Sequence, residues 1–328
     1  MTTFRILSLD GGGVRGAYSA AVLDEIEKDR RDRLADHFDL ITGTSTGGII
    51  AIGLGLGLSC QELVAFYKDR GPRIFPVTGV LGGMLGRARQ LFNLKYSSEA
   101  LHSALVEVFG DRKFGESKRA LVITAYNASH DGPHLFKHRP GSTRHANLRA
   151  VDVAMATAAA PLYFESRQLP LGGDGEDAVF IDGGVFANCP ALIGIAEATR
   201  YLGKELSDLE MLSIGTTYAA FKIRESERRA GLLQWNRRLL TMLLGAQESG
   251  TVGTARTLLD DRFLRISRSI DAAIPLDNAA LLEELIEWGR EDARNWLATN
   301  REKVCRRPAS NLPPNRTARR RKWSQESF

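Results

Sequence analysis

The stretch that decides the fold is LSLDGGGVRGAYSAAVLDEI, residues 7–26. It starts as a short apolar strand, passes through Asp10 and the three glycines at 11–13, and continues as a helix that carries a further glycine, Gly16. Each glycine costs backbone entropy on folding, so this turn must need a bare backbone. Backbone N–H groups at the start of a helix bind anions. The turn therefore predicts an anion site, for either a bound phosphate or a transient oxyanion.

Strand and helix signals alternate along the rest of the chain. Short β-rich runs occur at residues 4–9, 38–42, 120–126, 178–182 and 209–215. Apolar residues at helical spacing occur at residues 17–29, 47–57, 97–110, 232–247 and 278–297. This order predicts a three-layer α/β/α fold, in which helices cover both faces of a mostly parallel central sheet. The last two helices are expected to form a helical C-terminal extension.

The net charge of +5 is unevenly distributed along the chain. Residues 301–328 hold nine Lys and Arg against two Asp and Glu, which leaves residues 1–300 with 35 basic and 37 acidic side chains. The composition of this end is typical of disorder. We expect an α/β domain at 1–218, the helical extension at 219–300 and a disordered basic tail at 301–328. The tail fits either a solvated end or a segment attracted to anionic lipid or nucleic acid.

Cysteine usage and hydropathy favour a cytoplasmic protein. Cys60, Cys189 and Cys305 are far apart and form no CxxC pair, which argues against a disulfide scaffold or a cysteine metal site. Asp10 interrupts the first apolar segment, so no secretory signal is expected. The longest apolar run, residues 49–58, is too short to span a bilayer.

Two apolar segments can each be interpreted in two ways. Residues 71–96 are rich in glycine and have no clean period, which fits either a flap over a site or a packed loop. Residues 232–247 place their apolar side chains on one helical face. Such a face is typical of a core or oligomer contact, and less so of a lipid-binding helix. A homo-oligomer is therefore one of the expectations.

The glycine turn by itself fits a dinucleotide-binding motif. Residues 11–16 match G-x-G-x-x-G between a strand and a helix, where glycines let a pyrophosphate approach the helix. Asp39 lies at a suitable distance along the chain for an acid that binds ribose. A dinucleotide-dependent oxidoreductase is thus one alternative.

A second motif favours acyl transfer. Gly43, Ser45 and Gly47 form a G-x-S-x-G between a predicted strand and a predicted helix, the context of a nucleophile elbow. The turn would lift Ser45 to the edge of the sheet, with its backbone N–H facing the same space. An acyl-transfer site needs N–H donors aimed at the oxyanion. The glycine turn beside the serine is therefore better interpreted as an oxyanion hole than as a pyrophosphate site.

The sequence also restricts the base that would activate Ser45. The six histidines all lie at or before His145, in part within a polar stretch that predicts an exposed hairpin. Asp182 instead ends a short strand and precedes Gly183 and Gly184, which places its carboxyl at the rim where loops build sites. A carboxylate in a partly dry pocket can serve as a base. The alternative for this motif is an ordinary Asp-Gly-Gly turn.

In this order the motifs DGGGVRG, GTSTG and DGG resemble the patatin-like phospholipase family, and VITAYN, VDVAMATAAAPLYFES, FIDGGVFANCP and MLSIGT resemble further family stretches. The resemblance covers about residues 4–218. It implies a patatin-like catalytic domain that hydrolyses acyl esters of membrane phospholipids through a Ser-Asp dyad, without metal or organic cofactor. The implied roles are Ser45 as nucleophile and Asp182 as base. The implied oxyanion hole consists of the amides of Gly11, Gly12, Gly13, Val14 and Arg15.

The C-terminal part is similar to bacterial patatins of this length. Some of these are antiphage effectors that a cyclic oligonucleotide switches on to degrade membrane phospholipid. The resemblance therefore implies a cyclic-nucleotide activator and peripheral contact with the inner membrane, but no nucleic acid polymer as partner. A second alternative to the enzyme is a catalytically inactive lipid-binding protein on the same fold.

Overall fold

The computed structural model describes residues 3–76, 95–139, 145–172, 176–221, 223 and 232–304, without the side chains of 232–241 and 303–304. Residues 77–94, most of the segment predicted as a flap or packed loop, lie outside the described residues. The same holds for 305–328, most of the predicted tail.

Strands and helices alternate as the sequence predicts. The strands are β1 (Phe4–Leu9), β2 (Leu40–Thr44), β3 (Ala120–Asn127), β4 (Gly132–His138), β5 (Arg167–Leu169), β6 (Ala178–Asp182), β7 (Leu209–Tyr218) and β8 (Phe263–Ser269). The helices of the first half are α1 (Gly16–Arg30), α2 (Thr46–Gly55), α3 (Cys60–Ala65), α4 (Gly71–Ile74) and α6 (Ser98–Phe109). Those of the second half are α7 (Ala150–Thr157), α8 (Gly184–Ala187), α9 (Ala191–Ala196), α10 (Leu232–Leu259) and α11 (Leu282–Val304).

All the described strands belong to one sheet, with the order β5-β6-β3-β2-β1-β7-β8 and β4 paired to β3. The pairings β3-β2, β2-β1, β1-β7 and β7-β8 are parallel, and those of β4, β5 and β6 are antiparallel. Leu9 of β1 lies opposite Gly43 of β2. Because parallel strands end at the same edge, this register brings the glycine turn after β1 beside Ser45 after β2.

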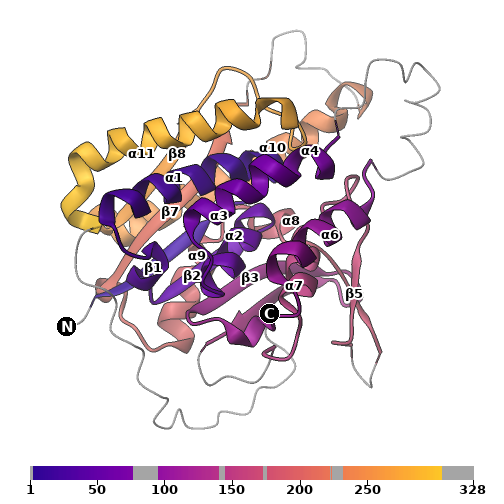
Figure 1. The fold of residues 1–328 in the computed structure, drawn as a ribbon, viewed down its shortest axis with the longest axis horizontal. Coiled ribbons are helices and arrows are strands. Elements are labelled where there is room, and N and C mark those ends of the chain that lie inside the picture. Colours follow the sequence, from indigo (N-terminus) through magenta and orange to yellow (C-terminus); the bar gives the residue numbers. More distant parts are fainter. Residues whose placement is uncertain are drawn as a thin grey trace.

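Two hydrophobic cores lie on opposite faces of the sheet. The larger core packs α1, α2, α3, α6, α7 and α11 against one face, as Figure 1 shows for the helices in front of the strands. The smaller core packs α9 and the end of α10, through residues such as Ile195 and Leu259, against Phe4 and Met211 on the other face. This confirms the predicted three-layer fold and its mostly parallel sheet.

The C-terminal region is helical, as predicted, but it also contributes a strand. β8 pairs in parallel with β7 and extends the sheet. α11 lies beside α1 (Figure 1), where a Cβ on Gly289 would be 2.4 Å from the Tyr18 carbonyl oxygen. It continues to Val304, and Arg301 forms an ion pair with Asp29. The first residues of the predicted tail are therefore helical.

The prediction of an exposed hairpin with exposed histidines is only partly right. β3 and β4 do form an antiparallel hairpin. His138 and His145, however, are buried. The His138 Nε2 lies 3.1 Å from the Ser117 carbonyl oxygen, and burial lowers the pKa of this histidine. These side chains fill space under the hairpin.

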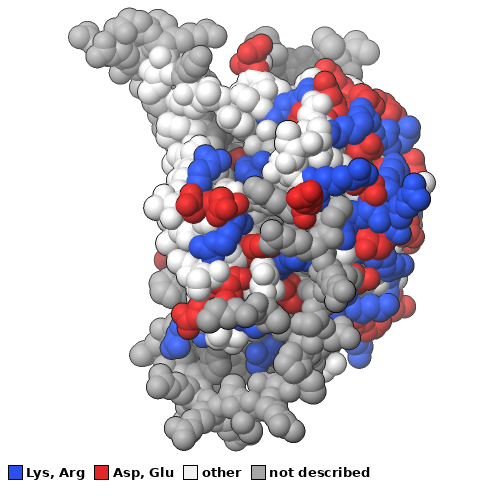
Figure 2. All heavy atoms as spheres, turned by 90° about the vertical axis from the view of Figure 1, so that its left-hand side faces the viewer, with Lys and Arg blue, Asp and Glu red and all other residues white. Residues whose placement is uncertain are grey.

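The surface charge is mixed where it can be seen. Figure 2 shows Lys and Arg interspersed with Asp and Glu over the described atoms of one face. That face offers no uniformly basic surface for a polyanion among those atoms. Within the described residues, no helix combines the length and the hydropathy needed to cross a bilayer.

Candidate active site

Ser45 occupies the sharp turn between β2 and α2. Its backbone has φ of 54° and ψ of −124°, a conformation that L residues rarely adopt and that often marks a functional site. A Cβ on Gly43 would lie 2.4 Å from the Gly47 carbonyl oxygen, and a Cβ on Gly47 would lie 2.3 Å from that of Leu9. Main-chain atoms cannot move aside easily, so both positions need glycine. The structure therefore has the strand–turn–helix geometry that G-x-S-x-G requires.

Gly47→Ala is expected to lower the free energy of unfolding by about 1–3 kcal/mol, because the methyl group would overlap the main chain at Leu9 and Asp10. Gly253→Ala in α10 is the matched control, since no atom lies within 4 Å of the added Cβ. That change should stabilise the helix by up to about 1 kcal/mol. Urea unfolding measures both, and an unchanged midpoint for Gly47→Ala would contradict the geometry of the turn.

The sequence predicts that the backbone N–H of Ser45 faces the site, but in the structure it does not. It donates to Thr157 Oγ1 at 2.9 Å. The Thr157 hydroxyl in turn donates to the Thr124 carbonyl oxygen at 2.6 Å. This short chain of hydrogen bonds ties the serine turn to α7 and β3, so the donors for an oxyanion must come from elsewhere.

The glycine turn has N–H groups that are available to an acceptor, but fewer than the five in the prediction. The Gly11 N–H donates to the Asn188 carbonyl oxygen at 2.9 Å, and the Val14 N–H to that of Leu276 at 2.8 Å. The Arg15 N–H donates to the Gly12 carbonyl oxygen at 3.2 Å. Among the residues that the structure describes, the N–H groups of Gly12 and Gly13 have no acceptor. The predicted set of five amides is thus reduced to these two.

Two other motif glycines are required by close packing. A Cβ on Gly16 would lie 2.1 Å from Thr46 Oγ1, where α1 contacts α2. A Cβ on Gly183 would lie 2.1 Å from Thr124 Oγ1. These glycines let the turns approach one another closely, and they bring the two ends of the site together.

Asp182 is the last residue of β6 and is 5% exposed. Burial raises the pKa of its carboxyl from 3.8 to about 6, while hydrogen bonds from the Ser45 hydroxyl and the Gly184 N–H offset part of that rise. The Gly184 N–H donates to Asp182 Oδ1 at 2.7 Å. The carboxyl and the serine hydroxyl, whose residues are 137 positions apart in the sequence, are therefore close enough for the hydroxyl to affect the pKa of the carboxyl.

These groups share one pocket, which is partly open to solvent. Gly12, Gly13, Ser45 and Asp182 all line it. Its walls are largely apolar and include Ile49, Phe66, Ile74, Phe75, Leu101, Pro161, Phe164, Val185, Leu244 and Leu276. A hydroxyl, a carboxyl and two unengaged N–H groups thus meet at the base of a space suited to an alkyl chain.

The chain matches the model of a known protein family. The family model described as patatin-like phospholipase matches residues 7–195, which is more than half of the chain. The chain belongs to the patatin-like phospholipase family. The family assignment confirms the prediction of an ester-hydrolysing enzyme of the phospholipase type that acts on lipid.

Several relatives of this patatin-like phospholipase have curated names. It is 35% identical to a "cGAMP-activated phospholipase" of Pseudomonas aeruginosa, over 83% of this chain and 80% of that one. It is 33% identical to a protein of the same name from Vibrio cholerae, over 90% of this chain and 92% of that one. Among solved structures it is similar to VipD from Legionella pneumophila, with 11% identity, a TM-score of 0.49, and coverage of 91% of this chain and 67% of that chain.

The position of Asp39 argues against the alternative of a dinucleotide-binding site. Asp39 immediately precedes β2, whereas the glycine turn follows the last residue of β1. Because β1 and β2 are parallel, Asp39 lies at the opposite edge of the sheet from the turn. Its carboxylate accepts the Arg5 N–H at 2.9 Å. It therefore cannot bind a ribose whose phosphate sits at the glycines.

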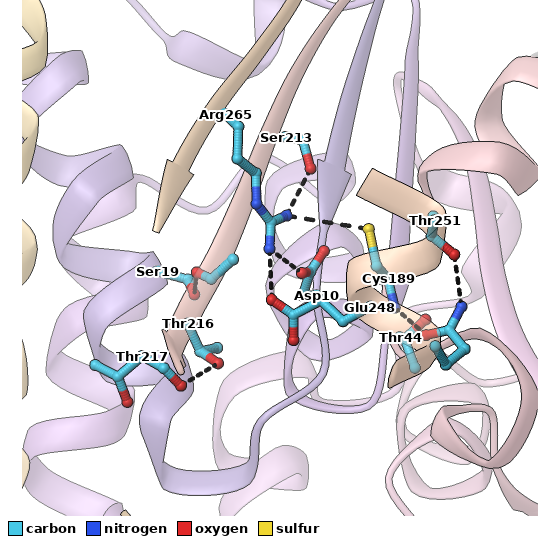
Figure 3. A network of polar contacts seen from close by, with 12 residues as sticks. Asp10, Ser19, Thr44, Cys189, Ser213, Thr216, Thr217, Glu248, Thr251 and Arg265 are labelled. Carbon is cyan, nitrogen blue, oxygen red and sulfur yellow. Dashed lines mark hydrogen bonds and ion pairs between the residues drawn. The ribbon is translucent and has the colours of Figure 1, made fainter. Parts of the chain in front are cut away.

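The C-terminal region of the patatin-like chain supports the glycine turn through a buried ion cluster (Figure 3). The Arg265 guanidinium on β8 contacts Asp10 Oδ2 at 2.6 Å, Glu248 Oε1 on α10 at 2.8 Å and Ser213 Oγ at 2.7 Å. Burial lowers the pKa of Arg265, but its acidic partners outweigh this and the net shift is upward. β8 and α10 thus fix the position of Asp10, the residue immediately before the three glycines.

Ser45 and Asp182 lie at the ends of strands, as the sequence predicts, whereas Thr157, Asn188 and Arg265 are not among the predicted site residues. Asn188 lies six positions after Asp182 and lines the pocket. Thr157 and Arg265 come from segments with no recognisable catalytic spacing. Their roles depend on which strands pair, and local sequence carries no signal for this.

Proposed function

We propose that this chain is a phospholipase A-type acyl hydrolase in which Ser45 is the nucleophile and Asp182 the general base. The observation that carries the proposal is that Ser45 and the buried Asp182 line the same largely apolar pocket, where the Ser45 hydroxyl lowers the raised pKa of the carboxyl. A serine hydroxyl attacks an ester efficiently only when a base accepts its proton. No histidine occurs in the described lining of the pocket, so the carboxylate takes that role.

The proposed reaction has two stages. Ser45 Oγ attacks the ester carbonyl carbon while its proton moves to Asp182, and the N–H groups of Gly12 and Gly13 stabilise the negative charge on the carbonyl oxygen. Cleavage of the ester C–O bond transfers that proton to the departing alcohol oxygen and leaves an acyl group on Ser45. Water, deprotonated by Asp182, then attacks the acyl group, and the fatty acid leaves as Ser45 recovers a proton.

The raised pKa of Asp182 suits this role. At about 6, the carboxyl is a stronger base than an ordinary aspartate, yet it is ionised at neutral pH. Its environment, rather than a third residue, supplies the basicity, because burial is the main cause of the shift.

The pocket walls favour recognition of the acyl chain. Its described lining is apolar apart from the groups at the base, the Asn188 amide and a few hydroxyls, and it contains no Lys or Arg that would bind a head-group phosphate. The head group would then lie outside the pocket. We therefore expect the enzyme to accept phospholipids with different head groups.

Exposed apolar side chains at the rim support contact with a membrane surface. Leu162 is 68% exposed, Val185 43% and Leu243 55%. Val185 lines the pocket, and the sequence neighbours of Leu162 and Leu243 line it as well. Apolar groups around the mouth of a lipid site would enter the interface and allow an acyl chain to reach Ser45 without crossing water.

Leu162→Glu is expected to reduce hydrolysis of phospholipid vesicles about tenfold, because a charge at the rim opposes entry into the interface. Hydrolysis of a soluble short-chain ester should stay within about twofold of the parent enzyme. The matched control is Leu258→Glu, which alters an exposed leucine outside the described pocket lining. Equal losses on vesicles and on the soluble ester would contradict a role at the membrane.

We also propose that a cyclic dinucleotide of the cGAMP type activates the enzyme, as part of a defence against viruses. The support lies in the names of relatives that are 33–36% identical over most of this chain. The test incubates purified protein with phospholipid vesicles, with and without cGAMP, and measures released fatty acid. We expect release only with the nucleotide. Fatty acid release without the nucleotide would refute only the proposed activator. No release with or without the nucleotide would refute the proposed function.

A further inference from the structure

Asn188 is a buried side chain that the proposed dyad does not use. It follows α8 and is 6% exposed. Its carbonyl oxygen accepts the Gly11 N–H, but its side-chain amide makes no hydrogen bond to any residue in the described part of the chain. The amide is open to the pocket, because Asn188 lines it and its polar atoms are not sealed from solvent. Because the amide reaches the pocket and makes no hydrogen bond to the described protein, it is available to a group that enters with the substrate.

The amide oxygen of Asn188 lies close to Gly11 and Gly184, two glycines that border Ser45 and Asp182. A Cβ built on Gly11 would be 2.5 Å from Asn188 Oδ1 and 3.3 Å from Ser45 Cβ. A Cβ built on Gly184 would be 3.4 Å from the same Oδ1 and 3.1 Å from Asp182 Oδ1. The amide therefore borders Gly11, the residue immediately before the two unengaged N–H groups.

We propose that Asn188 is a further catalytic residue, whose Nδ2–H donates a hydrogen bond to the oxyanion together with the N–H groups of Gly12 and Gly13. The inference rests on the proposed function of Ser45. A half-turn about χ2 exchanges the two ends of the amide, so either end can face the substrate. Asn188 also anchors the glycine turn through its main chain, and that bond does not depend on the side chain.

The test compares Asn188→Ala with Asn188→Asp, which keeps the shape of the side chain but removes the donor. For a soluble acyl ester we expect kcat to fall about 10²- to 10³-fold in each variant, with KM changed less than about threefold. A trifluoromethyl ketone, which forms a tetrahedral adduct on serine, should bind more weakly by a similar factor. A non-hydrolysable ether lipid should bind as it does to the parent enzyme.

Asn127→Ala is the matched control, because the Asn127 amide accepts hydrogen bonds only within the β3–β4 turn. A purely structural role for Asn188 predicts loss of thermal stability with kcat retained, and that result would overturn the inference. Activity lost in Ser45→Ala but retained in both Asn188 variants would leave the proposed function intact and refute only the third donor. Activity retained in Ser45→Ala would refute the proposed function itself.

Discussion

Ser45→Ala is expected to lower kcat for phospholipid hydrolysis by about 10⁶-fold, to the background rate, because the proposed mechanism forms the acyl intermediate on Ser45. The measurement is fatty acid release from vesicles and p-nitrophenol release from a soluble ester. Both should fall together, because both reactions use the same serine. Ser103→Ala, which alters an exposed hydroxyl on α6, is the matched control and should retain full activity.

The alanine variant should still fold. Its backbone must keep the positive φ of the turn, which costs about 1–3 kcal/mol in either residue, so the strain is not new. Circular dichroism and urea unfolding should give curves close to those of the parent enzyme. A folded Ser45→Ala that retains more than about 1% of the activity would require another nucleophile.

Asp182→Asn is expected to lower kcat about 10⁴-fold, because an amide cannot accept the serine proton. In the parent enzyme kcat/KM should fall as the pH drops through about 6, where the carboxyl becomes protonated, and should level off above it. The residual activity of the variant should lack this step. Asp177→Asn, at an exposed position just before β6, is the control.

The same substitution should stabilise the fold above pH 6. The folded state holds the Asp182 proton more tightly than the unfolded chain, so stability falls as the pH rises from 3.8 to about 6 and is level beyond it. Ionisation of Asp182 thus lowers the free energy of unfolding by about 3 kcal/mol, and Asp182→Asn removes this loss of stability. Urea unfolding at pH 4 and pH 8 should show that the variant is more stable than the parent enzyme only at pH 8. Equal gains at both pH values would contradict the burial of an ionised carboxylate.

Local sequence was sufficient to predict most of the fold and the placement of Ser45 and Asp182 at the ends of strands. Residues 7–26 alone predict β1, the glycine turn and α1, because apolar runs and glycines are strong local signals of strands, helices and turns. Ser45 and Asp182 could be predicted because each stands beside glycines at the end of a strand.

The remaining features depend on contacts between distant segments. β8 could not be recognised as a strand of this sheet, because its pairing with β7 joins segments about 50 residues apart. The proposed oxyanion hole is limited to Gly12 and Gly13 mainly because two distant carbonyl oxygens, those of Asn188 and Leu276, accept the N–H groups of Gly11 and Val14. His138 and His145 are polar in the sequence, yet the hairpin folds them inward.

The most direct test of the central claim is mass spectrometry of the intact protein and its peptides after reaction with a fluorophosphonate. We predict one adduct per chain, located on Ser45, that is absent from Ser45→Ala and forms far more slowly in Asp182→Asn. An adduct on another residue, or full catalytic turnover by protein that cannot be labelled at Ser45, would contradict the Ser45–Asp182 mechanism.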